Sequence, residues 1–285
     1  MTNFVASADG TRIAFDRFGQ GAPVVLVSGL FCSRPMTQDL ANRLAEQFTV
    51  INYDRRGRGE SSDTAPYAVR REIEDLGALI DAVGGEAAVY GHSSGAGLAL
   101  LAAATGLSIT RVVLHEPPYG GNDAASRASA RKLARNVWTA VARGDHDTAV
   151  TTFLIASGIP AEAAQDSGRD PGMRAVAPTM PYDFAVMGNF NDGGTIPVDL
   201  VRSVDIPALV LLGSTSPEFF ATTAMRLTKL LPHAQLCVLD GQNHAAPAEF
   251  VAPAVAAFLT GQTEHATYKR AVHFCVHGPF GRIRR

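Results

Sequence analysis

The sequence predicts an α/β protein with a mostly parallel, twisted sheet flanked by helices, and three features support this prediction. Short apolar runs typical of buried strands alternate with longer segments of helical periodicity, the order expected when crossover helices join parallel strands. The alternation is interrupted once, between about residues 117 and 204. With 285 residues, of which 46% are hydrophobic, the chain is long enough for one large domain carrying an insertion.

The first elements are strands. The segment FVASADGTRIAFDRFG predicts a hairpin around Asp9-Gly10, because an Asp-Gly pair between two strand-like runs favours a tight turn. The runs PVVLVSG and TVINYD are almost continuously apolar, as expected for parallel strands that are buried on both faces. These two runs begin the parallel part of the sheet.

Helices and strands then alternate. Residues 72–83 carry apolar side chains at helical spacing and end at Gly84-Gly85, and glycine often terminates a helix. The strand AAVYG leads into a helix of small residues, GAGLALLAAATG, and the strand RVVLHE stops at Pro117-Pro118. These elements complete the first part of the predicted core, residues 1–116.

Beyond Pro117 the pattern changes to alanine-rich amphipathic segments such as Ala124 to Ala142, so we expect residues 117–204 to form a mostly helical insertion over one edge of the sheet. Alternation resumes in residues 205–262, the second part of the core. This part holds the strand IPALVLLG, a helix near Thr222 to Leu231, the strand AQLCVLD and a helix from Ala248 to Leu259. We expect residues 263–285 to be a disordered tail.

Composition favours a small molecule as the partner. A formal net charge of -2 and a pI near 6.4 give no electrostatic reason to expect nucleic acid or an anionic membrane. The three cysteines fit neither a disulfide framework nor a zinc site, and no metal or organic cofactor is implied. The chain begins with no signal-peptide pattern and has no apolar stretch of membrane-spanning length, so we expect a soluble cytoplasmic protein. The excess of arginine over lysine indicates a GC-rich bacterial genome.

The strongest chemical signal is GHSSG, residues 91–95, which fits G-x-S-x-G with Ser93 at its centre. A serine hydroxyl is a weak nucleophile until a base takes its proton, so it must be held exposed beside that base. A tight turn between a strand and a helix does this, and flanking glycines remove the clash that side chains would cause there. The alternative is a chance glycine-serine turn, against which the strand before the motif and the helix after it both argue.

A second turn lies at the same predicted edge of the sheet. The segment VLVSGLF, residues 25–31, ends a strand in a glycine turn. Backbone N–H groups there and just after the serine could stabilise the oxyanion of a tetrahedral intermediate, and we assign these roles to Leu30 and Ser94. The alternative is that Ser28-Gly29 is only a loop, since backbone donors leave little trace in a sequence.

Four motifs in this order resemble the α/β-hydrolase family, in its large group with an inserted helical cap. In chain order they are the SGLF turn, YDRRGRGES at residues 53–61, GHSSG and GQNHAAP around His244. The resemblance spans about Phe4 to Leu259 and implies that residues 117–204 form the cap. It also implies that YDRRGRGES is mainly architectural, so Asp54 and Arg56 receive no catalytic role.

By the same resemblance, His244 is the general base that takes the proton of Ser93. A catalytic histidine needs an acceptor on its other nitrogen, and the turn that usually supplies an acid holds Ser216 instead. Glu116 is the favoured acid, because it ends the strand RVVLHE and parallel strands bring such ends to one edge. We expect Pro117 to hold Glu116 in an extended conformation. We assign Ser216 no function. Glu218, or no acid at all, is the alternative, and Asp240 is expected only to end a strand or cap a turn.

These residues predict a serine hydrolase that cleaves a carboxylic ester or lactone through an acyl-serine intermediate. Two alternatives are a cofactor-free lyase or cyclase that uses His244 as a base, and a non-catalytic ligand-binding protein on a hydrolase scaffold. An apolar substrate is suggested by a set of large side chains that could form the roof of a pocket, namely Trp138, Phe153, Leu154, Met180, Tyr182, Phe184, Met187 and Phe190.

Overall fold

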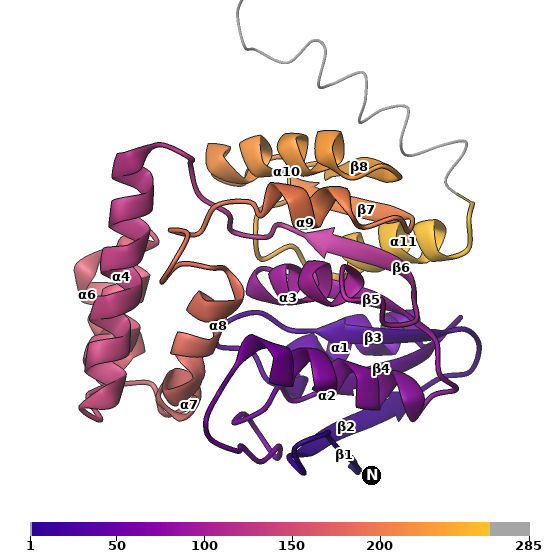
Figure 1. Ribbon diagram of the computed structural model, residues 1–285, viewed down its shortest axis with the longest axis horizontal. Helices are drawn as coiled ribbons and strands as arrows, with labels where there is room; N and C mark the ends of the chain where they lie inside the picture. Colours follow the sequence, from indigo (N-terminus) through magenta and orange to yellow (C-terminus); the bar gives the residue numbers. More distant parts are fainter. Residues whose placement is uncertain (1, 263–285) are drawn as a thin grey trace, which may run out of the picture.

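The predicted α/β fold is confirmed by a computed structural model, which describes residues 2–262 (Figure 1). Its eight-stranded sheet has the order β1-β2-β4-β3-β5-β6-β7-β8. The hairpin of β1 and β2 is antiparallel, β2 also pairs antiparallel with β4, and the remaining neighbours are parallel. The strands are β1 (Asn3–Ala6), β2 (Arg12–Phe18), β3 (Pro23–Val27), β4 (Thr49–Tyr53), β5 (Ala87–His92), β6 (Ile109–His115), β7 (Ala208–Gly213) and β8 (Ala234–Leu239).

Helices cover both faces of this sheet. One apolar core lies between the sheet and α2, α3, α9 and α10, and the other lies between the sheet and α1 and α11. Successive residues of β3 alternate between them, since Val25 and Val27 belong to the first core and Val24 and Leu26 to the second. The helices are α1 (Arg34–Leu44), α2 (Val69–Asp81), α3 (Ser94–Ala103), α9 (Val198–Arg202), α10 (Glu218–Leu230) and α11 (Ala248–Leu259).

Between β6 and β7 the chain forms mainly helices. Five of them, α4 to α8, and one 3-10 turn make up what we call the helical insertion, set to the side of the sheet toward which the β6 arrow points (Figure 1). The insertion has its own core, which includes Val137, Val150, Met180 and Phe184. Its elements are α4 (Ala124–Ala142), α5 (His146–Ala156), α6 (Ala161–Gly168), α7 (Pro171–Val176), η1 (Ala177–Thr179) and α8 (Met180–Val186). The last helix before β7, α9, packs instead on the sheet.

The element boundaries differ from the sequence prediction at three helices. Helix α1 was not predicted, α2 begins at Val69 rather than at residue 72, and α10 begins at Glu218 rather than near Thr222. The last difference places Glu218 in the first turn of a helix. The predicted tail, residues 263–285, lies outside the described residues.

Candidate active site

Ser93 occupies a strained turn between β5 and α3, with φ 55 and ψ -127. A positive φ is costly for a residue with a side chain, and such strain is concentrated at functional sites. The flanking glycines make the turn possible. A Cβ on Gly91 would lie 2.4 Å from the carbonyl oxygen of Gly95, and a Cβ on Gly95 would lie 2.3 Å from that of Val27. The GHSSG segment therefore has the geometry of a nucleophile elbow.

The turn after β3 lies against this serine. A Cβ added to Gly29 would come within 2.9 Å of the Cβ of Ser93, so Leu30, the next residue, is brought to the same place. Ser94 is the first residue of α3, where backbone N–H groups have no acceptor within the helix and the helix dipole favours negative charge. The two residues predicted to donate backbone N–H groups thus lie on segments that meet at Ser93.

His244 is hydrogen-bonded to Glu116, with 2.7 Å between Nδ1 and Oε2. The other carboxylate oxygen of Glu116 accepts from Ser216 Oγ at 2.6 Å and from the Gly213 backbone N–H at 2.7 Å. Burial of the carboxylate would by itself raise the pKa of Glu116, but the hydrogen bonds from His244, Ser216 and Gly213 outweigh it. The pKa of Glu116 therefore lies below its ordinary value, and the side chain is ionised at neutral pH.

The backbone of Glu116 corrects one expectation. A residue before proline usually takes an extended conformation, yet Glu116 has φ 48, in the left-handed region. It is held there by pairing to the next strand, because its N–H donates to the carbonyl oxygen of Leu211 at 3.2 Å. The turn ends β6 abruptly and leaves the carboxylate beside the end of β7, where Gly213 and Ser216 hold it.

The two other carboxylates near the end of β7 and β8 do not reach His244. Glu218 is exposed at the start of α10 and, within residues 2–262, its side chain makes no hydrogen bond or ion pair. Asp240 is exposed and accepts from Ser214 Oγ at 3.4 Å. The structure thus brings Glu116 to His244, and not the alternative Glu218.

Ser216 has a contact that the sequence analysis did not foresee. The sequence assigns it no function, whereas in the structure its hydroxyl donates to the carboxylate that binds His244. It stands where relatives of this chain are expected to carry an acid, and here it supports an acid that comes from another strand.

Replacing Ser216 with alanine is expected to raise the pKa of Glu116, since hydrogen bonds to an ionised carboxylate lower its pKa. Because the pKa of Glu116 is lower in the folded than in the unfolded protein, its contribution to stability is present above the unfolded pKa and is lost as pH falls through the folded pKa. The Ser216→Ala variant should therefore be less stable than the wild type by about 1 kcal/mol near neutral pH. That difference should shrink on acidification through the carboxylate range.

The measurement is the free energy of unfolding from denaturant titrations across that pH range. Thr215→Ala is the matched control, because the neighbouring hydroxyl donates to the carbonyl oxygen of Gln242 and not to a carboxylate. Its effect on stability should not change with pH. A Ser216→Ala effect that is equally independent of pH would contradict the prediction.

His92, inside the GHSSG motif, contacts the loop of the proposed base. Its Nε2 lies 2.9 Å from the carbonyl oxygen of His244, and the two rings are 4.7 Å apart. Phe220 also stacks on the imidazole of His244, at 4.6 Å with an interplanar angle of 16°. These contacts fix the orientation of the His244 ring. Histidine and phenylalanine residues near a motif are common in sequences, so their positions alone could not predict these ring contacts.

Burial keeps the neighbouring imidazoles neutral. Desolvation, with a smaller contribution from His244, lowers the pKa of His92 to about 4. Desolvation also lowers the pKa of His115 well below its usual value, and this side chain is hydrogen-bonded to the hydroxyl of Tyr90 at 2.7 Å. No positive charge is therefore placed beside His244 by these two residues at neutral pH.

An aromatic chain connects the SGLF turn to the helical insertion. Phe31 meets Phe153 edge to face at 5.7 Å, Phe153 meets Phe184 at 6.0 Å, and Phe184 meets Phe190 at 6.4 Å. Leu30 and Phe31 also pack on the core of the insertion. Trp138, another predicted roof residue, is 55% exposed and does not belong to this chain of contacts.

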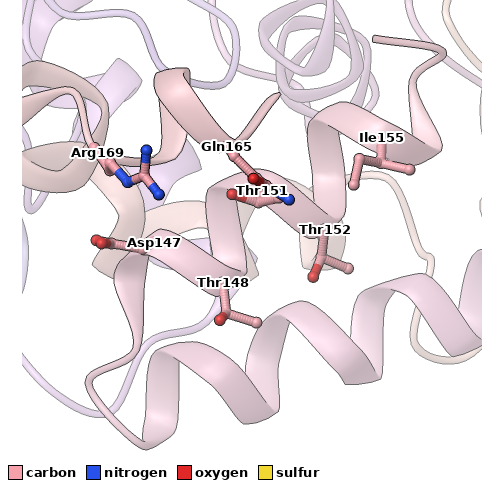
Figure 2. A pocket seen from close by; sticks show the side chains of 7 residues that line it. All are labelled: Asp147, Thr148, Thr151, Thr152, Ile155, Gln165 and Arg169. Carbon is pink, nitrogen blue, oxygen red and sulfur yellow. The ribbon is translucent and has the colours of Figure 1, made fainter. Parts of the chain in front are cut away.

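A separate cavity of about 340 Å³ lies within the insertion, between α5 and α6 (Figure 2). Six of its seven lining residues are of polar type, and none of Ser93, Glu116 and His244 lines it. Within residues 2–262, no group of three or more histidine, cysteine, aspartate or glutamate side chains is arranged to hold a metal ion. No helix in the same range combines the length and the apolar character needed to cross a bilayer.

The chain belongs to the alpha/beta hydrolase family, whose model matches residues 24–257. An alpha/beta hydrolase from Sphaerobacter thermophilus has 46% sequence identity and a TM-score of 0.81, over 90% of this chain and 100% of that one. The 2-(acetamidomethylene)succinate hydrolase of Mesorhizobium japonicum is 27% identical over 238 residues, which are 79% of this chain and 82% of the relative. The enol-lactonase of Burkholderia xenovorans shares the fold, with 20% identity and a TM-score of 0.65 over 90% of this chain and 100% of its own.

These findings confirm the family resemblance and support hydrolysis as the class of reaction. The roles of the individual site residues rest on the contacts described above.

Proposed function

We propose that the protein is a serine hydrolase that cleaves a carboxylic ester or lactone of a small, largely apolar substrate through an acyl-serine intermediate. The observation that supports this most strongly is the hydrogen bond between His244 and Glu116 at the edge of the sheet where Ser93 sits in a strained elbow. Nucleophilic acyl transfer requires a base that is oriented by an acidic partner, and the half-buried Ser93 follows His92, which contacts the His244 loop.

In this proposal, His244 takes the proton of the Ser93 hydroxyl as the oxygen attacks the substrate carbonyl. Glu116 accepts from Nδ1, which leaves Nε2 as the acceptor and stabilises the imidazolium that forms. The backbone N–H groups of Leu30 and Ser94 stabilise the oxyanion. His244 then gives the proton to the leaving oxygen, and a water molecule activated by the same histidine hydrolyses the acyl-serine.

We further propose that residues 117–204 form a cap over this site. The support is that the SGLF turn packs on the core of the insertion, and that the chain of phenylalanines from Phe31 to Phe190 continues from the proposed oxyanion hole into it. Such a wall favours an apolar acyl or alcohol group. Among the proteins with a similar fold are esterases and an enol-lactonase, which fits the same reaction class.

The test is covalent labelling with a fluorophosphonate, followed by intact mass and peptide mapping, together with a screen of short aryl esters and lactones. We expect one label per chain, located on Ser93, and none on Ser93→Ala. Turnover in the screen should disappear in the same variant, by about a million-fold if the residue acts as in other serine hydrolases. Absence of labelling in the wild type would overturn the proposal and favour a lyase or a binding protein.

A further inference from the structure

A buried ionic cluster lies between the helical insertion and the sheet, and we call it the Asp183 cluster: Asp183, Arg55, Arg58 and Glu72. Each of these residues is at most 2% exposed. Arg55 forms a two-point ion pair with Glu72 at 2.7 Å and contacts Asp183 Oδ1 at 2.6 Å, while Arg58 binds Asp183 Oδ2. Two positive and two negative charges balance, which a buried ionic group requires if it is not to destabilise the fold.

The cluster reaches both sides of the proposed oxyanion hole. On one side, Asp183 Oδ1 accepts from the hydroxyl of Ser94 at 2.6 Å. On the other side, Arg58 Nη1 donates to the carbonyl oxygen of Gly29 at 2.7 Å, and Arg55 Nη1 donates to that of Ser28 at 3.3 Å. Gly29 is the residue before Leu30, so the amides of Leu30 and Ser94 are attached to segments that the same ions hold.

Asp183 connects these contacts. It lies on α8 of the insertion, whereas Arg55, Arg58 and Ser94 belong to the core, and among residues 2–262 it alone binds all three. Removing its charge would leave Arg55 with the carboxylate of Glu72 but would leave Arg58 bound only to neutral groups, namely the Thr179 hydroxyl and the carbonyl oxygens of Gly29 and Cys32. Arg58, and the Gly29 carbonyl that it holds, would then lose their ionic anchor.

We infer that Asp183 is a positioning residue for the oxyanion hole: from the helical insertion it fixes, through Arg58 and Ser94, the spacing of the Leu30 and Ser94 backbone N–H groups. This inference rests on the proposed function. Loss of one oxyanion donor in a serine hydrolase lowers kcat by about 100- to 1,000-fold. Displacing the two donors without removing them should therefore lower kcat less, by about 10- to 100-fold. The loss should fall on kcat and not on KM, because the contact matters most when the oxyanion forms.

Three variants test this. Asp183→Asn keeps the shape of the side chain but removes the charge and turns a donor toward one of the arginines. Ser94→Ala removes only the hydroxyl that Asp183 accepts and keeps the Ser94 backbone N–H, so it provides a milder change in case Asp183→Asn does not fold. Asp75→Asn is the matched control: Asp75 is equally buried and paired with Arg56 at 2.7 Å, yet within residues 2–262 the hydrogen bonds of Arg56 go to Asp75, Asp9 and the carbonyl of Arg71, and none goes to residues 28–32.

The readouts are the rate constant of fluorophosphonate labelling, the fraction of chains finally labelled, and kcat and KM for an ester. We expect both Asp183→Asn and Ser94→Ala to be labelled completely. The rate should be about 10- to 100-fold lower in Asp183→Asn and several-fold lower in Ser94→Ala, while KM changes by less than about twofold in both. Asp75→Asn should label at the wild-type rate, even if it is less stable.

Two results would overturn the inference. A variant whose labelled fraction falls while the remaining chains react at the wild-type rate would show that Asp183 only holds the fold together. Equal rates in Asp183→Asn, Ser94→Ala and Asp75→Asn would do the same. If the proposed function were wrong, the wild type itself would not be labelled, which distinguishes that case from the two results above. The inference about Asp183 would then be wrong as well.

Discussion

Glu116→Gln is expected to lower kcat for ester hydrolysis by about 10,000-fold, the effect of replacing the orienting acid of a serine hydrolase by its amide. The reason lies in the three donors that surround the carboxylate. The Gly213 backbone N–H and the Ser216 hydroxyl approach Oε1, and His244 approaches Oε2. A glutamine at position 116 would turn its carbonyl oxygen toward the Gly213 N–H, which cannot rotate away, and so present its NH₂ group to His244.

The consequence is the wrong histidine tautomer. An NH₂ group facing Nδ1 favours the form protonated on Nε2, and that form cannot accept the proton of Ser93. The measurement compares kcat, together with the rate of fluorophosphonate labelling, between the wild type and Glu116→Gln. Glu218→Gln is the control, because this carboxylate is exposed at the start of α10 and should leave both rates within a few-fold. If Glu218→Gln abolished activity and Glu116→Gln did not, the assignment of the acid would be wrong.

The second large effect is on folding. Gly95→Ala should prevent the protein from reaching its native structure, because the new methyl group would lie 2.3 Å from the carbonyl oxygen of Val27 and 2.7 Å from that of Ser28. Both atoms are backbone at the end of β3, so the clash cannot be relieved by a side-chain rotation. Either α3 or β3 must move, and we expect a loss of more than about 4 kcal/mol in the free energy of unfolding.

Gly77→Ala is the control for this change. It makes the same substitution in the middle of α2, where the nearest atom outside the helix is a terminal methyl group of Leu107 at 3.4 Å. Alanine favours a helix over glycine by about 1 kcal/mol, so Gly77→Ala should be neutral or stabilising. Chemical denaturation and the soluble yield of both variants provide the comparison. Native stability in Gly95→Ala would contradict the tight packing of α3 against β3.

The sheet could be predicted from the sequence because its central strands are almost continuously apolar runs. Helix α1 could not, since its buried positions, Arg34, Leu40, Ala41 and Leu44, include a charged residue and leave its first half without an apolar stripe. The first turns of α2 and α10 were missed for a related reason. They begin with VRR and with EFFA after a proline, and neither segment has the apolar spacing that defines the rest of its helix.

The same distinction applies to the candidate site. That Glu116 and His244 meet follows from parallel strands ending at one edge, and topology made the pairing predictable. The φ of Glu116 was not predictable, because the strand pairing to Leu211 overrides the local preference imposed by Pro117. Asp183 left no local signal at all: its arginine partners are 128 and 125 residues away, and it stands between Tyr182 and Phe184, which suggested only a roof of apolar side chains.

The shared carboxylate of Glu116 has a consequence for how many acids such a site can hold. Ser216 and His244 bind the same side chain, one on each oxygen, so the ends of β6 and β7 both lie within reach of the histidine. The position of the acid beside His244 can thus be reached from the end of either β6 or β7. A carboxylate at position 216 would meet Glu116 at the place of this hydrogen bond, and the two acids would have to share a proton because like charges that close cannot both ionise. The site therefore holds one ionised acid at a time, whichever strand supplies it.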